Sequence, residues 1–411
     1  MKKELLLENL ANLSVKIGAN VQQNQIVVIN GPIDSKEIIR KIVEKAYEAG
    51  AKEVYVNWQD EYIAKMNVEY QTIETLQVFP QHNIDRFKYF VDNGACVISI
   101  ASPVPGLNEG LDPKKQQVQA IAAGRALGFV RDHMMNNRSQ WSIIATANPV
   151  WAKKVFPDKD EDDAVEALWE AIFKASRVTE DTDPVQEWKE HNNRLIKHRQ
   201  IMTDYQFKSL HFKNELGTDL TVELVKNHIW SGGQELATNG VVFNPNIPTE
   251  ENFTMPLKTG VNGKVVATKP LDYQGNLVED FWLEFKDGKV VNYDAKVGKA
   301  NLENLINFDE GASYLGEVAL ISYDSPISKS NILFFNTLFD ENASCHLALG
   351  RAYPMNIEGG TEMSMEELTK HGYNNSMTHV DFMFGSKDLD IFGETQNREK
   401  VQIFKNGNFV I

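Results

Sequence analysis

Short apolar runs alternate with amphipathic stretches through the first half of the chain. The apolar runs predict buried β-strands, at residues 25–30, 53–58 and 95–100. Apolar residues at helical spacing predict helices, at residues 35–48, 113–133 and 161–175. Strands that alternate with helices indicate an α/β domain with a doubly wound, mostly parallel sheet. No glycine-rich phosphate-binding motif follows any of these strands, so the pattern does not support a nucleotide site.

The pattern changes near residue 200, where hairpin signals replace the strand–helix alternation. Gly217 separates two strand-like runs, Asp287-Gly288 separates two more, and Asn406-Gly407 lies between apolar residues close to the end of the chain. The second half is therefore predicted to be an α+β domain rich in antiparallel strands. We place the boundary in the charged helical stretch at 184–200, giving domains 1–190 and 191–411.

Charge is distributed unevenly along this chain of 411 residues. The formal net charge is −15, and −9 of it lies in residues 301–411. An acidic chain argues against nucleic acid or an anionic membrane as partner, since both require a basic surface. The first residues predict an amphipathic helix rather than a signal peptide, because Glu4 and Glu8 interrupt the apolar residues. With only Cys96 and Cys345 available for a disulfide, we expect a cytoplasmic protein.

A histidine and an aspartate share one face of a predicted strand at residues 377–384. Alternation places His379 and Asp381 on one side of this strand, with Val380 and Phe382 on the other. An imidazole and a carboxylate that project together from a rigid strand suit a divalent metal ion. Taken alone, the spacing favours the alternative, in which His379 and Asp381 form an ion pair at the surface.

A second set of polar residues follows Phe339. Residues 340–344 are typical of a capped helix start, and the pattern predicts a helix that runs to Tyr353 before Pro354. On such a helix His346 and Tyr353, seven residues apart, would share one face, while Glu341 would come from the loop or the cap. The alternative is a set of capping acids with a buried histidine and tyrosine. Cys345 is interpreted as a small buried residue.

Two further carboxylate segments complete the set. Glu250 and Glu251 lie in a loop bounded by Pro248 and Pro256, and Glu317 stands at the mouth of an apolar strand. None of these signals is specific by itself. Together they supply carboxylates and two histidines from four separated segments, which is the ligand mixture of hydrolytic sites that hold two divalent ions.

Six segments spread over nearly the whole chain carry a resemblance to a known family; they are residues 44–51, 151–157, 246–256, 315–320, 335–346 and 377–381. In the order and spacing of their acidic residues they resemble the thermophilic-type metalloaminopeptidases, the family of aminopeptidase T and aminopeptidase S. This resemblance implies a two-metal site with the ligands Glu251, Glu317, Glu341, His346, His379 and Asp381. It implies Glu317 as the bridging ligand and Tyr353 as the catalytic tyrosine. Glu250 remains an alternative to Glu251 as the ligand.

The resemblance implies a function as well as a site. The expected protein is a metal-dependent aminopeptidase that removes the N-terminal residue from peptides with a free N-terminus, through a water activated by two divalent ions. Zinc, cobalt and manganese are the expected metals, and a homodimer is the expected assembly. Two alternatives stay open, namely another two-metal hydrolase such as an amidase or deacetylase, and a non-catalytic binding protein that retains the fold.

Overall fold

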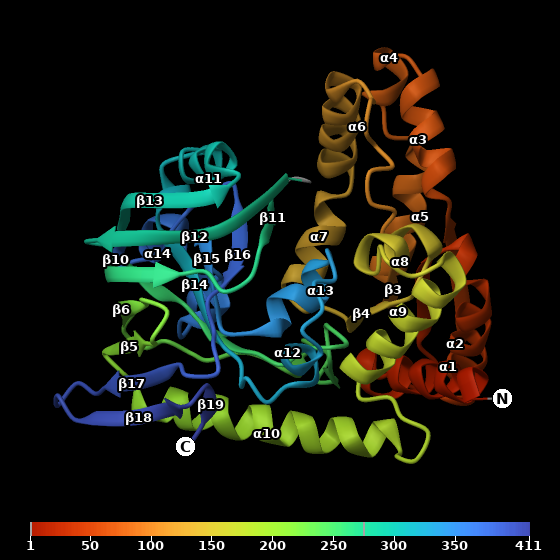
Figure 1. Ribbon diagram of the computed structural model, residues 1–411. Coiled ribbons are helices and arrows are strands. Elements are labelled where there is room, and N and C mark those ends of the chain that lie inside the picture. Colours follow the sequence, from red (N-terminus) through yellow and green to blue (C-terminus); the bar gives the residue numbers. More distant parts are fainter. Residues whose placement is uncertain (1, 274–275) are drawn as a thin grey trace. The chain divides into compact units, whose positions relative to one another are not determined.

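The structure is a computed structural model that describes residues 2–273 and 276–411. It divides into two compact units, one formed by residues 1–190 and 234–248 and the other by residues 191–233 and 249–411. The ribbon in Figure 1 follows the chain through both units. Each unit is described by itself below.

The first unit is built on a four-stranded parallel sheet with the strand order β2-β1-β3-β4. Its strands are β1 (Ile26–Pro32), β2 (Glu53–Gln59), β3 (Cys96–Ala101) and β4 (Trp141–Ala145). The central strand β1 is buried over nearly all of its length, as expected for a parallel strand that is covered on both faces. The parallel α/β region predicted from the sequence is thereby confirmed. Two short strands, β7 (Glu235–Leu236) and β8 (Val242–Phe243), pair separately.

Helices surround this sheet, and their apolar residues recur at helical spacing. In α2 (Lys36–Glu48) the buried side chains Ile38, Ile39, Ile42 and Ala46 form one stripe. Side chains cap several of the helices, as where Asp160 accepts the backbone N–H of Asp163. Helices α3 (Glu61–Tyr70) and α6 (Pro113–Ala126) run side by side (Figure 1). The other helices are α1 (Lys2–Leu13), α4 (Ile73–Leu76), α5 (Gln81–Asp92), α7 (Gly128–Met135), α8 (Pro149–Val155) and α9 (Glu161–Ala175).

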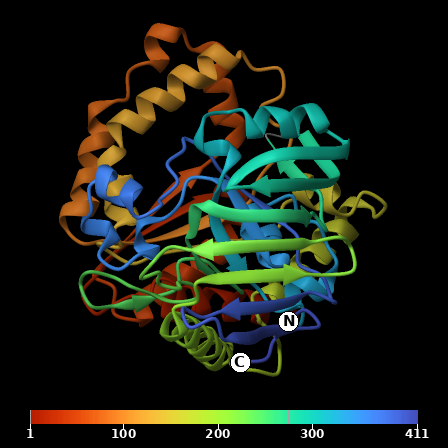
Figure 2. The ribbon, with the colours of Figure 1, turned by 90° about the vertical axis from the view of Figure 1, so that its left-hand side faces the viewer.

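A large antiparallel sheet forms one layer of the second unit, and its strands lie side by side in Figure 2. Asp287 and Gly288 both adopt positive φ, as the predicted hairpin turn requires. The strands, nine among the described residues, are β5 (Ser209–Lys213), β6 (Asp219–Leu224), β10 (Pro256–Val266), β11 (Leu271–Tyr273), β12 (Asn276–Lys286), β13 (Lys289–Val297), β17 (Asp390–Glu394), β18 (Lys400–Lys405) and β19 (Asn408–Phe409). The antiparallel second half predicted from the sequence is confirmed.

A smaller antiparallel sheet packs against the large one and has the strand order β16-β15-β14-β9. Its strands are β9 (Asn252–Thr254), β14 (Leu315–Leu320), β15 (His346–Gly350) and β16 (His379–Met383). Val318, Leu347 and Phe382 form one row across three of these strands and belong to the core between the two sheets. The Phe382 ring lies 5.7 Å from the ring of Phe281 on β12. Because side chains alternate along a strand, the opposite face of the small sheet is available for a site.

Helices and short turns connect the strands of this unit. They are α10 (Pro184–Tyr205), which begins in the first unit, α11 (Lys299–Ile306), α12 (Pro326–Ser330), α13 (Thr337–Asp340) and α14 (Met365–Lys370). A 3₁₀ turn at Glu341–Ala343 follows α13 directly. No helix among the described residues is long and apolar enough to cross a membrane.

The helix predicted from residue 340 to Tyr353 is wrong. A 3₁₀ turn at Glu341–Ala343 is followed by strand β15, so His346 projects from a strand and Tyr353 lies beyond its end. The strand is buried along its whole length between β14 and β16. Residues 347–349 are therefore apolar without alternation, and a run of this kind cannot be distinguished from a buried helix by periodicity. The placement of Glu317 at the mouth of a strand also needs correction, because Glu317 is the third residue of β14.

Candidate metal centre

The free face of the small sheet carries most of the residues that the sequence singled out. In the strand register Glu317 lies opposite Ala348, which lies opposite Asp381, and Gly350 lies opposite His379. Directly opposed residues of an antiparallel pair share one face, so these side chains rise from the same surface. The pairing of neighbouring strands therefore brings together carboxylates and imidazoles from distant parts of the sequence.

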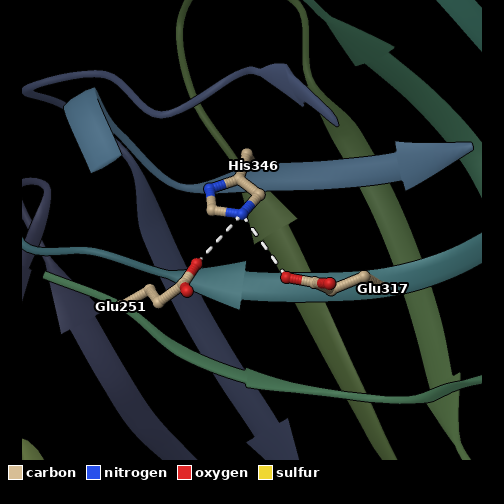
Figure 3. A group of neighbouring side chains, drawn as sticks. All are labelled: Glu251, Glu317 and His346. Atoms are coloured by element: carbon tan, nitrogen blue, oxygen red, sulfur yellow. Dashed lines mark ion pairs between the residues drawn. The ribbon is translucent and has the colours of Figure 1, made fainter. Parts of the chain in front are cut away.

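The first group of donors consists of Glu251, Glu317 and His346 (Figure 3). His346 Nε2 lies 3.3 Å from Glu251 Oε2 and 3.4 Å from Glu317 Oε1. Figure 3 shows the imidazole nitrogen directed between the two carboxylates. The ligand-type atoms of all three residues lie within 4.8 Å of one another, which is close enough to share one cation.

The second group consists of Glu317, His379 and Asp381. His379 Nε2 lies 3.5 Å from Glu317 Oε2 and 3.3 Å from Asp381 Oδ1. Glu317 thus belongs to both groups, with one carboxylate oxygen facing each imidazole. A carboxylate in this position is able to bridge two cations.

Backbone carbonyls orient both imidazoles. The Nδ1–H of His379 donates to the carbonyl of Arg351 at 2.7 Å, and that of His346 donates to the carbonyl of Ser344 at 3.3 Å. In each ring Nε2 is consequently the nitrogen that faces the carboxylates. Metal-ligating histidines are held in this way, with the other ring nitrogen bonded to a backbone carbonyl or carboxylate.

The backbone carbonyl of Arg351, which orients His379, lies so close to Gly316 that it leaves no room for a side chain there. A Cβ atom at Gly316 would lie 2.4 Å from the carbonyl oxygens of both Arg351 and Gly350. Contacts this short are essentially never seen for a real Cβ atom, and these atoms are backbone, so only glycine fits beside Glu317.

Glu341 reaches the centre from the 3₁₀ turn rather than from a strand. Burial raises its pKa well above the usual value, and the neighbouring carboxylates of Glu251 and Asp381 raise it further. These electrostatic influences indicate that Glu341 lies near Glu251 and Asp381, although it belongs to neither of the two donor groups.

Tyr353 lies against the same centre. Its ring centroid is 4.9 Å from that of His379 and 6.0 Å from that of Phe253. Burial raises the pKa of the Tyr353 phenol, and the carboxylates of Glu317 and Asp381 raise it further. The phenol therefore keeps its proton at neutral pH and can donate a hydrogen bond.

The carboxylates of Glu250 and Glu251 are placed differently. Glu251 lies within the first group, whereas Glu250 Oε2 lies 3.9 Å from Nε2 of the buried His191 on α10. The structure therefore brings Glu251, and not Glu250, together with His346 and Glu317.

The donor set suits divalent cations on two grounds. Asp381 Oδ1 is buried, and within residues 2–273 and 276–411 it has the ion-pair contact with His379 Nε2 but no hydrogen bond, as expected of an atom that binds a cation. The centre also concentrates Glu251, Glu317, Glu341 and Asp381, which carry four negative charges when ionised. Two divalent cations would balance these charges, and histidine and carboxylate are ligands that zinc and related metals accept.

The electrostatics of the imidazoles lead to the same conclusion. Burial alone would lower the pKa of His346, but Glu251 and Glu317 raise it well above the ordinary value. Burial likewise opposes the charge on His379, and Asp381 and Glu317 overcome that effect. Without a cation the carboxylates hold protons on the imidazoles, so metal binding and proton release are coupled here.

Sequence reasoning missed several residues that shape the centre. Asn342 is fully buried and contacts two of the segments that carry candidate ligands, and Ala348 and Gly350 leave the face of β15 open between the donors. In the sequence, the one indication that Asn342 belongs to the centre is its position directly after Glu341. Ala348 carries no signal of its own, because its role depends on the strand register.

A centre of carboxylates and imidazoles on a sheet face is the ligand mixture of metal-dependent hydrolases. Comparison with known proteins specifies the family: residues 3–409 match the family model described as thermophilic metalloprotease (M29). The chain therefore belongs to the thermophilic metalloprotease family M29.

Relatives of the chain match it over almost its full length. The aminopeptidase AmpS of Bacillus subtilis is 47% identical over 403 residues, covering 98% of both chains. Aminopeptidase 2 of Geobacillus stearothermophilus is 45% identical and covers 98% of this chain and 97% of its own. The solved structure of wild-type AmpT from Thermus thermophilus superposes with a TM-score of 0.91 at 37% identity, covering 99% of each chain.

Proposed function

We propose that this protein is a metal-dependent aminopeptidase that hydrolyses the N-terminal residue of peptides with the help of two divalent ions. The observation that carries the proposal is Glu317, whose two oxygens lie 3.4 and 3.5 Å from Nε2 of His346 and His379. The names of the relatives, which are aminopeptidases, support the substrate class. Residues 191–411 would form the catalytic metal-binding domain and residues 1–190 the N-terminal α/β domain.

The proposed ligands are Glu251, Glu317, Glu341, His346, His379 and Asp381. When bound, two divalent ions supply Lewis acidity and lower the pKa of a water molecule towards neutrality. Zinc, cobalt and manganese all accept this mixture of oxygen and nitrogen ligands. Glu317 and His346 are buried and the other donors are partly buried, which strengthens each charge interaction.

Tyr353 is the proposed catalytic tyrosine. Its protonated phenol, packed on the ring of His379, can donate a hydrogen bond to the negative oxygen that develops on the scissile carbonyl. Glu250 is the remaining carboxylate near the ligands, and we propose it as a partner for the ammonium group of the substrate. Its charge suits a free N-terminus, which is what separates an aminopeptidase from an amidase or deacetylase.

The first experiment measures metal content together with activity. Purified protein is assayed on aminoacyl-nitroanilides and on the same compounds with an N-acetyl group, before and after chelation and after addition of zinc, cobalt or manganese. We expect hydrolysis of the free amines alone, loss of activity on chelation and recovery with metal. Preference for the acetylated compounds would favour an amidase or deacetylase, and protein that binds no metal would favour a binding protein that retains the fold.

Assembly and location are separate predictions. One chain has a mass of 46.5 kDa, and a homodimer would have twice that mass in analytical ultracentrifugation. A cytoplasmic location is tested by fractionation of the cells that make the protein.

A further inference from the structure

We infer that Asn342 is a positioning residue whose amide holds the turn of Glu341 against the segment of Glu250 and Glu251, and so fixes the spacing of the Glu341 and Glu251 carboxylates. The inference rests on the proposed function, because the spacing matters only if both carboxylates bind metal. It concerns the support of the ligands and not their identity.

The contacts of Asn342 join two segments that are far apart in the sequence. Its Oδ1 accepts the backbone N–H of Glu250 at 2.8 Å, and its Nδ2 donates to the carbonyl of Leu338 at 3.2 Å. The same Nδ2 lies 3.5 Å from Oε1 of Glu341. The side chain is fully buried, so water does not compete for these groups.

Glu341 needs such a support more than the other candidate ligands do. Glu317, His346, His379 and Asp381 lie on paired strands, whose register fixes their positions relative to one another. Glu341 lies in the 3₁₀ turn at Glu341–Ala343, outside these strands. Its place beside Glu251 therefore depends on contacts of the turn, and Asn342 provides a hydrogen bond to the residue that precedes Glu251.

An amide is chemically suited to this position. The centre already contains four carboxylates, and a further charged side chain would add to their repulsion or neutralise one of them. An asparagine offers one acceptor and two donors without a charge. It can satisfy the Glu250 N–H and the Leu338 carbonyl together, which a carboxylate cannot do.

The test is a titration of zinc into metal-stripped protein in competition with a chromophoric chelator. The wild-type chain is compared with Asn342→Ala, at a temperature well below the unfolding of either. We expect two binding steps in the wild type, of which one weakens by about 10–100-fold in Asn342→Ala, as found when groups that support metal ligands are removed. The other step stays unchanged, because its ligands lie on the paired strands.

Two further variants separate positioning from general stability. Asn214 is a loop amide of the same unit that accepts the backbone N–H groups of Leu216 and Thr218, and Asn214→Ala is expected to leave both steps unchanged. If Asn342→Ala does not fold, Asn342→Ser, whose hydroxyl is too short to reach Glu250, replaces it under the same criteria.

Two outcomes would overturn the inference: two unchanged steps in Asn342→Ala, or an equal loss in both steps. The proposed function fails by a different result, namely a wild-type chain that binds no zinc. The two failures are therefore distinguishable in the same titration.

Discussion

Replacing Glu317 with glutamine is the sharpest test of the centre, because the change removes one charge and one metal-binding oxygen while keeping the shape of the side chain. Glu317 is buried on β14 and faces His346 with one oxygen and His379 with the other. Burial raises its pKa, but the hydrogen bonds of the two imidazoles lower it more, so the wild-type side chain is a carboxylate at neutral pH. In Glu317→Gln one proposed metal site therefore loses an oxygen ligand, and the other keeps only a neutral amide oxygen in place of a carboxylate oxygen.

The expected loss of metal affinity in Glu317→Gln follows from the free energy that each ligand contributes. Structural zinc sites with four ligands bind with about 10–16 kcal/mol, or about 2.5–4 kcal/mol for each ligand, which corresponds to about 10²–10³-fold in affinity. At a metal concentration of 100 times the wild-type Kd, each bound ion stabilises the wild-type chain by about 2.7 kcal/mol. A 100-fold weaker site at the same concentration gives only about 0.4 kcal/mol. Glu317→Gln should thus lose most of the metal-induced rise in Tm.

The assay is thermal unfolding with and without zinc, alongside metal content and hydrolysis of an aminoacyl-nitroanilide. Glu250→Gln is the matched control, since Glu250 is also buried but lies beside His191 rather than within either donor group. Glu250→Gln should retain the metal-induced rise in Tm. A Glu317→Gln variant that binds two ions and keeps full activity would refute the bridging role and the two-metal site with it.

Three further predictions concern the phenol, the open face of β15 and the loop before β16. Tyr353→Phe should lower kcat by about 10²–10³-fold with metal content unchanged, as for the loss of an oxyanion donor, and an unaltered kcat would remove Tyr353 from the mechanism. Ala348→Leu should abolish metal binding by filling the space between the donors, whereas Ala348→Gly should retain it, as measured by metal analysis. Asp309 accepts the Met377 N–H at 2.7 Å and the Ser376 hydroxyl, and although burial raises its pKa these bonds lower it on balance. Its stabilisation is therefore present above the unfolded pKa and is lost as the pH falls, so Tm of wild type and Asp309→Asn should converge on acidification.

The sequence predicts the parts of this centre that depend only on residues close together in the chain. His379 and Asp381 lie two residues apart, so strand alternation alone places them on one face, and the structure confirms that placement. The environment of His346 could not be predicted in this way, because β15 is buried on both sides and its apolar run resembles a helix. The approach of Glu251 to His346 depends on a long-range strand pairing, which a single sequence does not reveal.

The small sheet explains why candidate ligands from distant segments can share one centre. Along β15 the residues on the free face are His346, Ala348 and Gly350, so a donor is followed by a methyl group and then by no side chain at all. Glu317 and Asp381 flank Ala348 from the two neighbouring strands, and the small side chain between them leaves room for an ion. The opposite row of Val318, Leu347 and Phe382 is packed into the core, which fixes the register. A slip of one residue would turn the donors into the core and the apolar row outwards, so the packing that stabilises the sheet also sets the positions of these donors.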